Sequence, residues 1–446
     1  MSAPSLLWYG DDFTGAADTL ATLAQAGWRA MLFLRPPSTD QIERAARALG
    51  GAVEAIGVAG VARSLKPADL PAELEPVMRC FVESACSVLH YKVCSTFDSS
   101  PDIGNIAEAI RMFRTVATNP FVPIAGGQPS LGRFCAFSTL FASAGQGGTV
   151  ERIDRHPTMA HHPVTPMTEA DLRQHLMHQG LTDIAAWHLP AWEASQPRQH
   201  EHLGRLLDAG SGPILFDITA ARHLGFLGEL IAARSSLQPL LAVGASSVAQ
   251  ALSAADPRRA GAGAALCHQP PANGSRQGPA LILAGSLSPV TARQVQNASS
   301  YRTIRLDCAA LLDPEHGSQH AHDQVLAGLE SGENVLAVTA PEHGTQPDTA
   351  HSPRIAAATS AWITALLKQI EQRGIALKRL GIAGGDTASL ATRALPAWGL
   401  SYAGSLGPGA PIKRLHSESA ALNGLELLLK GGQMGSIDLF DRFAAY

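Results

Sequence analysis

The chain has 446 residues, of which 46% are hydrophobic and 16% are charged, and its formal net charge at pH 7 is -4. This length exceeds one typical hydrophobic core, so we expect two domains of roughly 150–250 residues each. Because phosphate backbones are bound by clustered lysine and arginine, the lack of a basic excess argues against a nucleic-acid partner.

The start of the chain carries no basic segment, and no apolar run in the sequence is long enough to span a bilayer. We therefore expect a cytoplasmic protein with no membrane partner. The six cysteines include no C-x-x-C pair, which favours reduced and mostly buried thiols over a zinc ribbon or a disulfide framework.

Short apolar runs that end in Gly, Asp or Ser alternate with Ala- and Leu-rich segments of helical periodicity, a pattern typical of parallel sheets covered by helices. The predicted fold class is α/β, with two domains that each contain a mostly parallel sheet flanked by helices and an active site in the cleft between them. In the first half the predicted strands are 6–9, 30–34, 53–58, 88–93, 121–125 and 214–217, and the first predicted helix is 16–26.

A segment rich in turn-forming residues, 255–279, interrupts the alternation and predicts a linker. We expect a substrate-binding domain over 1–254 and a nucleotide-binding domain over 280–446. In the second domain the predicted strands are 280–284, 301–306, 334–339 and 380–383, and the predicted helices begin at Pro289 and cover 356–372.

Two carboxylates, Asp11 and Asp12, directly follow the first predicted strand and precede the first helix. Open α/β sheets bind ligands at the carboxyl ends of their strands, so this position favours a functional site. Thr14 is the expected helix cap, and an aspartate here can accept hydrogen bonds from substrate hydroxyls. The alternative is that both aspartates only complement the helix dipole.

A second polar segment, Lys92 to Ser100, also ends an apolar run and combines a cation, several hydroxyls and a carboxylate. These groups suit an anionic, hydroxylated ligand. A capped turn with a solvated lysine is the alternative. Arg63 follows a third apolar run and is a candidate for the same site.

The segment 155–163 contains three histidines, His156, His161 and His162, between two prolines. Their spacing matches neither H-E-x-x-H nor another zinc-ligand pattern, so we assign no metal site there. We expect a loop over the cleft.

Four glycine-rich segments follow strands or precede helices in the second half, where backbone amides can approach phosphates closely. None is a Walker A sequence, and no G-x-G-x-x-G motif occurs. Together they favour nucleotide binding, with ordinary glycine turns as the alternative. The segments are Gly285-Ser286-Leu287-Ser288, Gly384-Gly385-Asp386-Thr387, the glycine loop 404–411 and Gly431-Gly432.

Taken in order, these motifs resemble the four-carbon acid sugar kinase family along nearly the whole chain. The match is specific because the order of the motifs and their division between the two halves agree as well as the residues. The residues that carry it are Asp11 to Ala16, Lys92 to Ser99, Gly285 to Ser288 with Thr291 and Gln294, Gly384 to Thr387, and Lys430 to Gly432.

The resemblance implies ATP-dependent phosphorylation of the terminal hydroxyl of acids such as threonate, erythronate and 3-oxo-tetronates, with Mg²⁺ as a cofactor. If the chain is such a kinase, the position of Asp12 at the end of the first strand and the start of a helix favours it as the catalytic residue. The oligomeric state stays open, with a homodimer as one candidate. The implied substrate-binding residues are Asp11, Asp12, Arg63, Lys92, Val93, Cys94 and Ser95. The implied nucleotide-binding residues are Ser286, Gly384, Gly385, Asp386, Thr387, Gly407 and Gly431.

The motif from Lys92 to Ser99 is closer to that of oxo-tetronate kinases than to that of threonate kinases. The segments 100–103 and 126–130 and the histidine-rich loop depart from the family pattern. A branched or five-carbon acid such as 3-oxo-isoapionate therefore remains an alternative substrate. A nicotinamide-dependent dehydrogenase would need the dinucleotide fingerprint that is missing here, and a non-catalytic sugar-acid binding protein would need no nucleotide loops.

Overall fold

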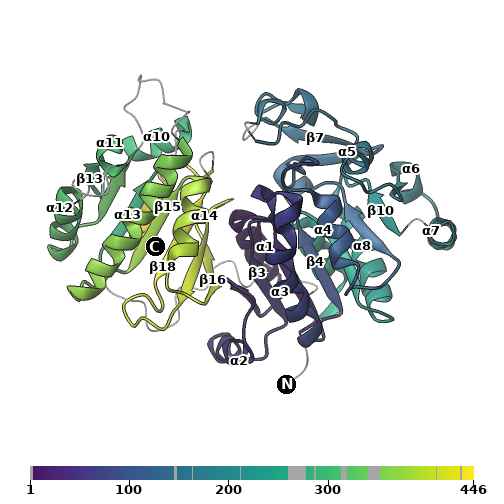
Figure 1. Cartoon of the computed structure of the whole chain (residues 1–446), viewed down its shortest axis with the longest axis horizontal. Helices are drawn as coiled ribbons and strands as arrows, with labels where there is room; N and C mark the ends of the chain where they lie inside the picture. The colour runs from purple at the N-terminus through teal and green to yellow at the C-terminus, as the bar shows by residue number, and fades with distance from the viewer. Residues whose placement is uncertain are drawn as a thin grey trace. The chain divides into compact units, whose positions relative to one another are not determined.

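The chain divides into two compact units, Met1–Leu266 and Cys267–Tyr446 (Figure 1). The computed structural model describes residues 4–144, 148–162, 164–210, 212–259, 278–285, 288–312, 319–339, 352–407, 409–431 and 434–446. Most of the expected linker, 260–277, lies outside these residues. Within the described ranges, no helix is long and apolar enough to cross a membrane.

The first unit is built on a parallel sheet with strand order β2-β3-β1-β4-β11-β5-β10-β9. Every residue of β1, β3 and β4 is buried, as expected for parallel strands covered by helices. The strands are β1 (Leu6–Gly10), β2 (Ala30–Phe33), β3 (Ala55–Ala59), β4 (Val88–Lys92), β5 (Val122–Ala125), β9 (Ala185–Trp187), β10 (Pro213–Phe216) and β11 (Leu240–Gly244).

The helices of this unit form two packed groups, one of α1, α8 and α9 and one of α3, α4 and α5. Alanine- and leucine-rich faces supply the packing, as the sequence pattern predicts. The helices are α1 (Phe13–Gln25), α2 (Thr39–Ala48), α3 (Leu70–Glu83), α4 (Ile106–Phe113), α5 (Leu172–His178), α6 (Leu189–Trp192), α7 (Gln196–Asp208), α8 (Ala221–Ser235) and α9 (Ser247–Ala255).

The strand order of the first sheet reverses between β1 and β4. The chain leaves β1 through α1 toward β2 on one side, and it leaves β4 through α4 toward β5 on the other. The two strands are neighbours, with Gly10 opposite Lys92. Ligands of open α/β sheets bind at such a reversal, outside the carboxyl ends of the strands.

A small antiparallel sheet of β6 (Arg133–Ala136), β7 (Thr139–Ser143) and β8 (Val150–Arg152) follows β5. Its β6–β7 turn contains two non-glycine residues with positive φ, Phe137 (50°) and Ser138 (65°). The buried Asp217 carboxylate accepts hydrogen bonds from the backbone N–H groups of both, at 2.7 and 2.9 Å, and from that of Leu189 at 3.0 Å. One acceptor beyond β10 therefore stabilises the turn and fixes the small sheet.

The second unit contains a mixed sheet with strand order β13-β14-β12-β15-β18-β17-β16. The strands β13, β14, β12, β15 and β18 are parallel, whereas β17 is antiparallel to both of its neighbours. The strands are β12 (Ala280–Ala284), β13 (Arg302–Arg305), β14 (Val335–Val338), β15 (Arg379–Ala383), β16 (Gly399–Ser405), β17 (Pro411–His416) and β18 (Glu426–Lys430).

Its strand order reverses between β12 and β15, which are neighbours with Ala284 opposite Ala383. The chain leaves β12 through α10 toward β13, and it leaves β15 through α14 toward β16. The helices of this unit are α10 (Pro289–Gln296), α11 (Cys308–Leu311), α12 (Gln319–Glu330), α13 (Ser352–Gln372), α14 (Gly385–Ala394) and α15 (Leu439–Ala445).

The predicted α/β class is confirmed, and all ten predicted strands are present within about two residues of their expected ends. The glycine loop expected over 404–411 is shorter than predicted, because Gly404 and Ser405 end β16 and Pro411 begins β17. The parallel strands β9 and β18 and the central strand β11 were not predicted. The sequence of β11, Leu-Leu-Ala-Val-Gly, is too short to separate a strand from a buried helical turn by periodicity.

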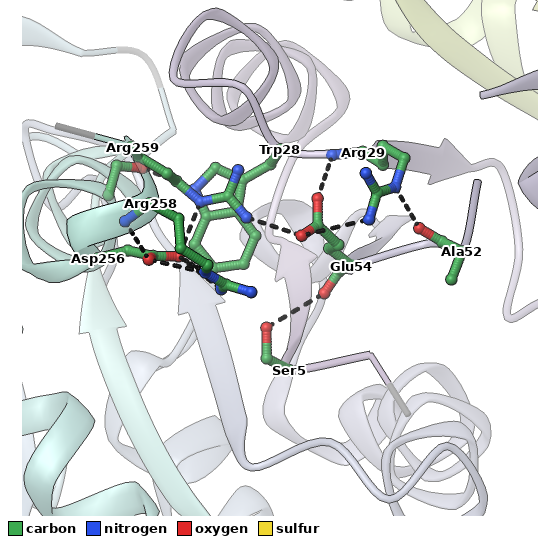
Figure 2. A network of polar contacts seen from close by, with 9 residues as sticks. Ser5, Trp28, Arg29, Ala52, Glu54, Asp256, Arg258 and Arg259 are labelled. Atoms are coloured by element: carbon green, nitrogen blue, oxygen red, sulfur yellow. Dashed lines mark hydrogen bonds and ion pairs between the residues drawn. The ribbon is translucent and has the colours of Figure 1, made fainter. Parts of the chain in front are cut away.

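A network of charged and aromatic side chains closes the amino edge of the first-unit sheet (Figure 2). Glu54 accepts hydrogen bonds from Arg259 NH2 at 3.0 Å and from the Arg29 backbone N–H at 2.9 Å. The Arg259 guanidinium lies 4.0 Å from the centre of the Trp28 ring. These contacts tie the last described segment of the unit to the beginnings of β2 and β3.

Candidate functional site

Asp12 is the N-cap of α1, and its Oδ1 accepts a hydrogen bond from the Gly15 N–H at 2.8 Å. The expectation that Thr14 caps this helix is wrong, because the helix begins at Phe13 and Thr14 lies within its first turn. The Asp12 side chain is 24% exposed, and its Oδ2 accepts no hydrogen bond from the described part of the chain. Asp12 therefore presents one free carboxylate oxygen at the edge where the strand order reverses.

Asp11, in contrast, is only 2% exposed and is held by Arg63. Arg63 donates to both carboxylate oxygens of Asp11, from Nε at 3.2 Å and from NH2 at 2.9 Å, and its NH2 lies 3.0 Å from Asp12 Oδ1. Burial opposes the charge of Arg63, but the carboxylates of Asp11 and Asp12 raise its pKa well above the usual value. The structure thus brings these three predicted residues together.

Lys92 ends β4 next to this cluster, and its side chain is buried. Its Nζ donates to the Val93 carbonyl oxygen at 2.7 Å. A Cβ atom on Gly15 would lie 2.5 Å from Lys92 Nζ and 2.6 Å from Asp12 Oδ1. The missing side chain of Gly15 is therefore what lets the lysine approach the capping aspartate.

The loop after Lys92 turns most of its polar groups inward. Thr96 Oγ1 donates to Asp98, and Ser99 Oγ lies 2.8 Å from His175 Nε2. Burial raises the pKa of the Cys94 thiol to about 11, so the thiol is neutral near pH 7. Cys94 and Ser95 remain partly exposed, whereas Thr96 to Ser99 support the loop.

Sequence reasoning missed two residues that support this loop from α5 and its end, His175 and Gln179. Gln179 Nε2 donates to Ser99 Oγ at 2.7 Å, and Gln179 Oε1 accepts from the Ile106 N–H at 2.7 Å. No local signal connects a helix at 172–178 with a loop near 99, because their contact depends on tertiary packing.

In the second unit, the turns after β12 and β15 lie side by side at the reversal of strand order. The Gly285 N–H donates to the Ala383 carbonyl oxygen at 2.8 Å, and a Cβ on Gly285 would lie 2.9 Å from Thr387 Oγ1. Gly384 has φ of 129°, a conformation that L side chains rarely adopt. Gly385, Asp386 and Thr387 form the first turn of α14, and Ser286 lies outside the described residues.

Gly431 follows β18, the strand next to β15, and the preceding residue is a buried lysine. Lys430 Nζ donates to Thr291 Oγ1 at 2.8 Å, and burial lowers the lysine pKa to about 8. Gln294 Nε2 donates to the carbonyl oxygens of Met434 and Ser436, at 3.1 and 2.8 Å. Helix α10 therefore holds the backbone at Met434 and Ser436 in place.

Lys430 is a further candidate that the predicted site did not include. The signal that could have found it is a lysine at the end of an apolar run and directly before two glycines. Gly407, which was included, lies in the β16–β17 turn, where its N–H donates to Ser405 Oγ at 3.2 Å and its carbonyl accepts from the Ala410 N–H at 3.1 Å.

The histidine-rich segment makes local hydrogen bonds. His156 Nδ1 accepts from the Thr158 and Met159 N–H groups, and His162 Nδ1 accepts from the Thr165 N–H. A cavity of about 350 Å³ lies elsewhere, at the amino edge of the first sheet. Its lining residues include Ser5, Trp28, Ser87, Asp256 and Arg258, none of which belongs to the predicted site.

Two family models match the chain: a sugar-binding N-terminal domain over residues 6–252 and a nucleotide-binding C-terminal domain over residues 281–440. The chain is 31% identical to a 3-oxo-isoapionate kinase of Paraburkholderia graminis, over 98% of this chain and 93% of that protein. It is also 31% identical to a 3-oxo-tetronate kinase of Methylobacterium radiotolerans, over 97% of this chain and 96% of that protein.

Solved structures show the same fold. A protein of Salmonella typhimurium LT2 superposes with a TM-score of 0.80 at 22% identity, over 98% of both chains. A Haemophilus influenzae protein superposes with a TM-score of 0.72 at 22% identity, over 98% of both chains. The two family models and the full-length relatives together establish that this chain belongs to the four-carbon acid sugar kinase family, whose members are sugar-acid phosphotransferases.

Proposed function

We propose that the protein is an ATP-dependent kinase that phosphorylates the terminal hydroxyl of a four-carbon acid sugar, of the 3-oxo-tetronate or the threonate and erythronate type. The observation that carries this proposal is the arrangement of Asp12, Arg63 and Lys92 at the reversal of strand order in the sugar-binding domain. The alternative substrate, a branched or five-carbon acid such as 3-oxo-isoapionate, is supported by the 3-oxo-isoapionate kinase relative.

Asp12 is the proposed catalytic residue. Its Oδ1 is occupied by the Gly15 N–H and by Arg63, and its Oδ2 has no partner in the described structure. A substrate hydroxyl that donates to Oδ2 is aligned for attack and can lose its proton to the carboxylate. Asp11 instead has a supporting role, because both of its oxygens are engaged by Arg63.

Lys92 and Arg63 supply the positive charge next to Asp12. Phosphoryl transfer places negative charge near the attacking oxygen, and positioned cations stabilise that charge. Val93, Cys94 and Ser95 line the same edge as the first residues of the loop after Lys92.

In the second unit, ATP is proposed to bind at the turns after β12, β15 and β18. Backbone N–H groups at the start of α14 suit phosphate oxygens. Helix α10 begins with Pro289, which has no N–H, and its Val290 N–H donates to Ser288 Oγ. The described residues contain no group of three or more His, Cys, Asp or Glu side chains that could hold a metal ion. We therefore propose that Mg²⁺ arrives bound to the phosphates of ATP, with few direct protein ligands.

A coupled ADP-release assay tests the proposal. The purified protein is assayed with ATP and Mg²⁺ against a panel of four- and five-carbon acid sugars. We expect ADP release only when a four-carbon acid sugar or, for the alternative substrate, a branched or five-carbon acid is present. A parallel thermal-shift measurement with ATP, NAD⁺ and the acids separates the other classes, because a ligand that binds the folded state raises the melting temperature. Stabilisation by NAD⁺ but not by ATP would indicate a dehydrogenase, and stabilisation by acids alone would indicate a binding protein.

A further inference from the structure

Two residues of the first unit, Gln128 and Arg133, meet next to the proposed acid-sugar site. Gln128 follows β5 at the carboxyl edge of the sheet, and Arg133 begins β6. They form an antiparallel bridge, with the Gln128 N–H donating to the Arg133 carbonyl oxygen at 3.0 Å and the Arg133 N–H to the Gln128 carbonyl oxygen at 3.2 Å. Directly opposed residues of an antiparallel pair place their side chains on the same face.

Both side chains keep a buried polar atom without a partner. Gln128 is 2% exposed, and its Oε1 accepts no hydrogen bond. Arg133 Nε is buried and donates no hydrogen bond, although NH1 donates to the Leu131 carbonyl oxygen at 2.7 Å. Because an unpaired buried polar atom costs free energy, two of them on one face indicate that a polar ligand completes the site.

This face lies close to the loop that follows Lys92. Burial lowers the pKa of Arg133, and the nearby Cys94 and Asp98 oppose that shift. The same two side chains also act on Arg63. Arg133 and Arg63 therefore both lie within electrostatic reach of the loop, and Arg133 comes from a different element, the small sheet.

The cations differ in how fully they are engaged. Arg63 is held by the two carboxylates of Asp11 and Asp12, and Lys92 Nζ donates to the Val93 carbonyl oxygen. Arg133 makes no ion pair with a carboxylate of the described residues. A half-buried guanidinium without a counter-ion is a suitable partner for an anionic ligand group, and carboxylates bind arginine strongly.

We propose that Arg133 binds the carboxylate of the acid-sugar substrate and that Gln128 accepts a hydrogen bond from a hydroxyl beside it. This inference rests on the proposed function, since it concerns the substrate of the same site. It assigns to Arg133 the recognition of the acid group, and it leaves Arg63 to hold the two aspartates.

The test compares acids with uncharged analogues. We would measure two ligands as substrates or competitors: the best acid of the ADP-release panel, and the uncharged tetritol or pentitol with the same number of carbons. Each ligand is tested with the wild type, with Arg133→Met and with Arg133→Lys. Arg133→Met should raise the KM for the acid roughly 10- to 100-fold, because a hydrogen-bonded charge is lost, and should leave the KM for ATP unchanged. Its affinity for the polyol should not change, and Arg133→Lys should recover part of the preference for the acid.

Gln128→Met should behave differently, because a hydroxyl contact is shared by both ligands. Gln128→Met should weaken the binding of the acid and the binding of the polyol to the same extent. Arg152→Met is the matched control on the same small sheet, since Arg152 is exposed and paired with Asp154. This control should keep the wild-type KM for the acid.

Three outcomes would overturn the inference. The KM for the acid could be unchanged in Arg133→Met, the affinities for acid and polyol could fall equally in that variant, or Arg152→Met could raise the KM for the acid as much as Arg133→Met does. If the wild type releases no ADP with any acid, the proposed kinase function fails, and the contact is tested separately by calorimetric titration of the acids. If the wild type binds an acid and Arg133→Met binds it more weakly, the proposed contact between Arg133 and the carboxylate is supported. If Arg133→Met binds the acid as tightly as the wild type does, or if the wild type binds no acid, the proposed contact is refuted.

Discussion

The edge where the strand order reverses carries charged side chains in the first unit and glycine turns in the second. In the first unit Arg63 contacts both Asp11 and Asp12 there, and Lys92 Nζ lies on the other side of Gly15 from the Asp12 carboxylate. In the second unit the turns after β12 and β15 present Gly285 and Gly384 next to Thr387. The topology of a parallel sheet therefore provides the edge in both units, and the residues placed on it decide which ligand it suits.

The difference has a physical basis. A hydroxylated acid differs from similar sugars in single groups, so side chains with defined charge and direction are needed to recognise it. Phosphate groups are alike in every nucleotide, and backbone amides at a helix start suffice to hold them. Four substitutions, two of them with a control substitution, test this contrast.

The largest effect is expected for Asp12→Asn. The substitution keeps the size of the side chain but removes its basicity, so kcat should fall by about 10²–10⁴-fold, as is typical for general-base residues. Steady-state ADP release measures it.

Asp11→Asn is the control for this comparison. Because Asp11 is buried against Arg63, we expect it to lower the melting temperature more than Asp12→Asn does and to affect kcat less. Near-normal turnover in Asp12→Asn together with a collapse in Asp11→Asn would reverse the two roles.

Gly15→Ala should separate activity from stability. A Cβ at this position would displace Lys92 Nζ or Asp12 Oδ1, so kcat/KM for the acid should fall about 10- to 100-fold. Alanine is the better helix former, which offsets part of the loss of the Asp12 cap, so the melting temperature should fall only slightly while activity falls strongly.

The matched control is Gly204→Ala in α7, where a Cβ meets nothing within 4 Å. It should raise stability slightly, by about 0.5–1 kcal/mol, and leave activity unchanged. If Gly15→Ala keeps full activity, the close approach of Lys92 to Asp12 is not needed for the reaction.

Gly385→Val tests the glycine side of the comparison. A branched side chain at the start of α14 should obstruct the approach of phosphates to the backbone amides and weaken ATP binding about tenfold. Acid binding should stay as in the wild type, and calorimetry with each ligand alone measures both. Unchanged ATP affinity in a folded variant would remove this turn from the nucleotide site.

The smallest effect concerns pH and Lys430, the one buried cation that we place beside the glycine turns. Burial lowers its pKa from 10.5 to about 8, so its protonated fraction falls by about fivefold between pH 8 and pH 9. If the charge assists phosphate binding, ATP affinity should fall over this interval by at most that factor. The unfolding free energy should rise with pH between about 8 and 10.5, because the unfolded chain then holds more protons than the folded one.

Lys430→Arg should remove the pH dependence of ATP binding in this interval, since arginine keeps its charge. Acid binding, measured in parallel, should not follow the titration of Lys430. The same pH profile in the wild type and Lys430→Arg would show that another group titrates.

The sequence alone determined the α/β class, ten of the thirteen parallel strands in the described residues and the motifs that end them, because these depend on local periodicity and on residues next to one another in the chain. It also carried the family resemblance, which the domain models confirm. It led to Asp12 as the proposed catalytic residue, but it did not show which contacts distinguish Asp12 from Asp11, because the two carboxylates are adjacent and share the same local context.

Only the tertiary structure decided that Arg63 buries Asp11 and leaves an oxygen of Asp12 free, that β11 lies between β4 and β5, and that His175 and Gln179 hold the loop near Ser99. The same holds for the electrostatic interaction of Arg133 with Cys94 and Asp98 of that loop. These contacts join segments that are far apart in the chain, and strand order and side-chain packing create them. A local sequence pattern contains no information about which distant segment will lie opposite it.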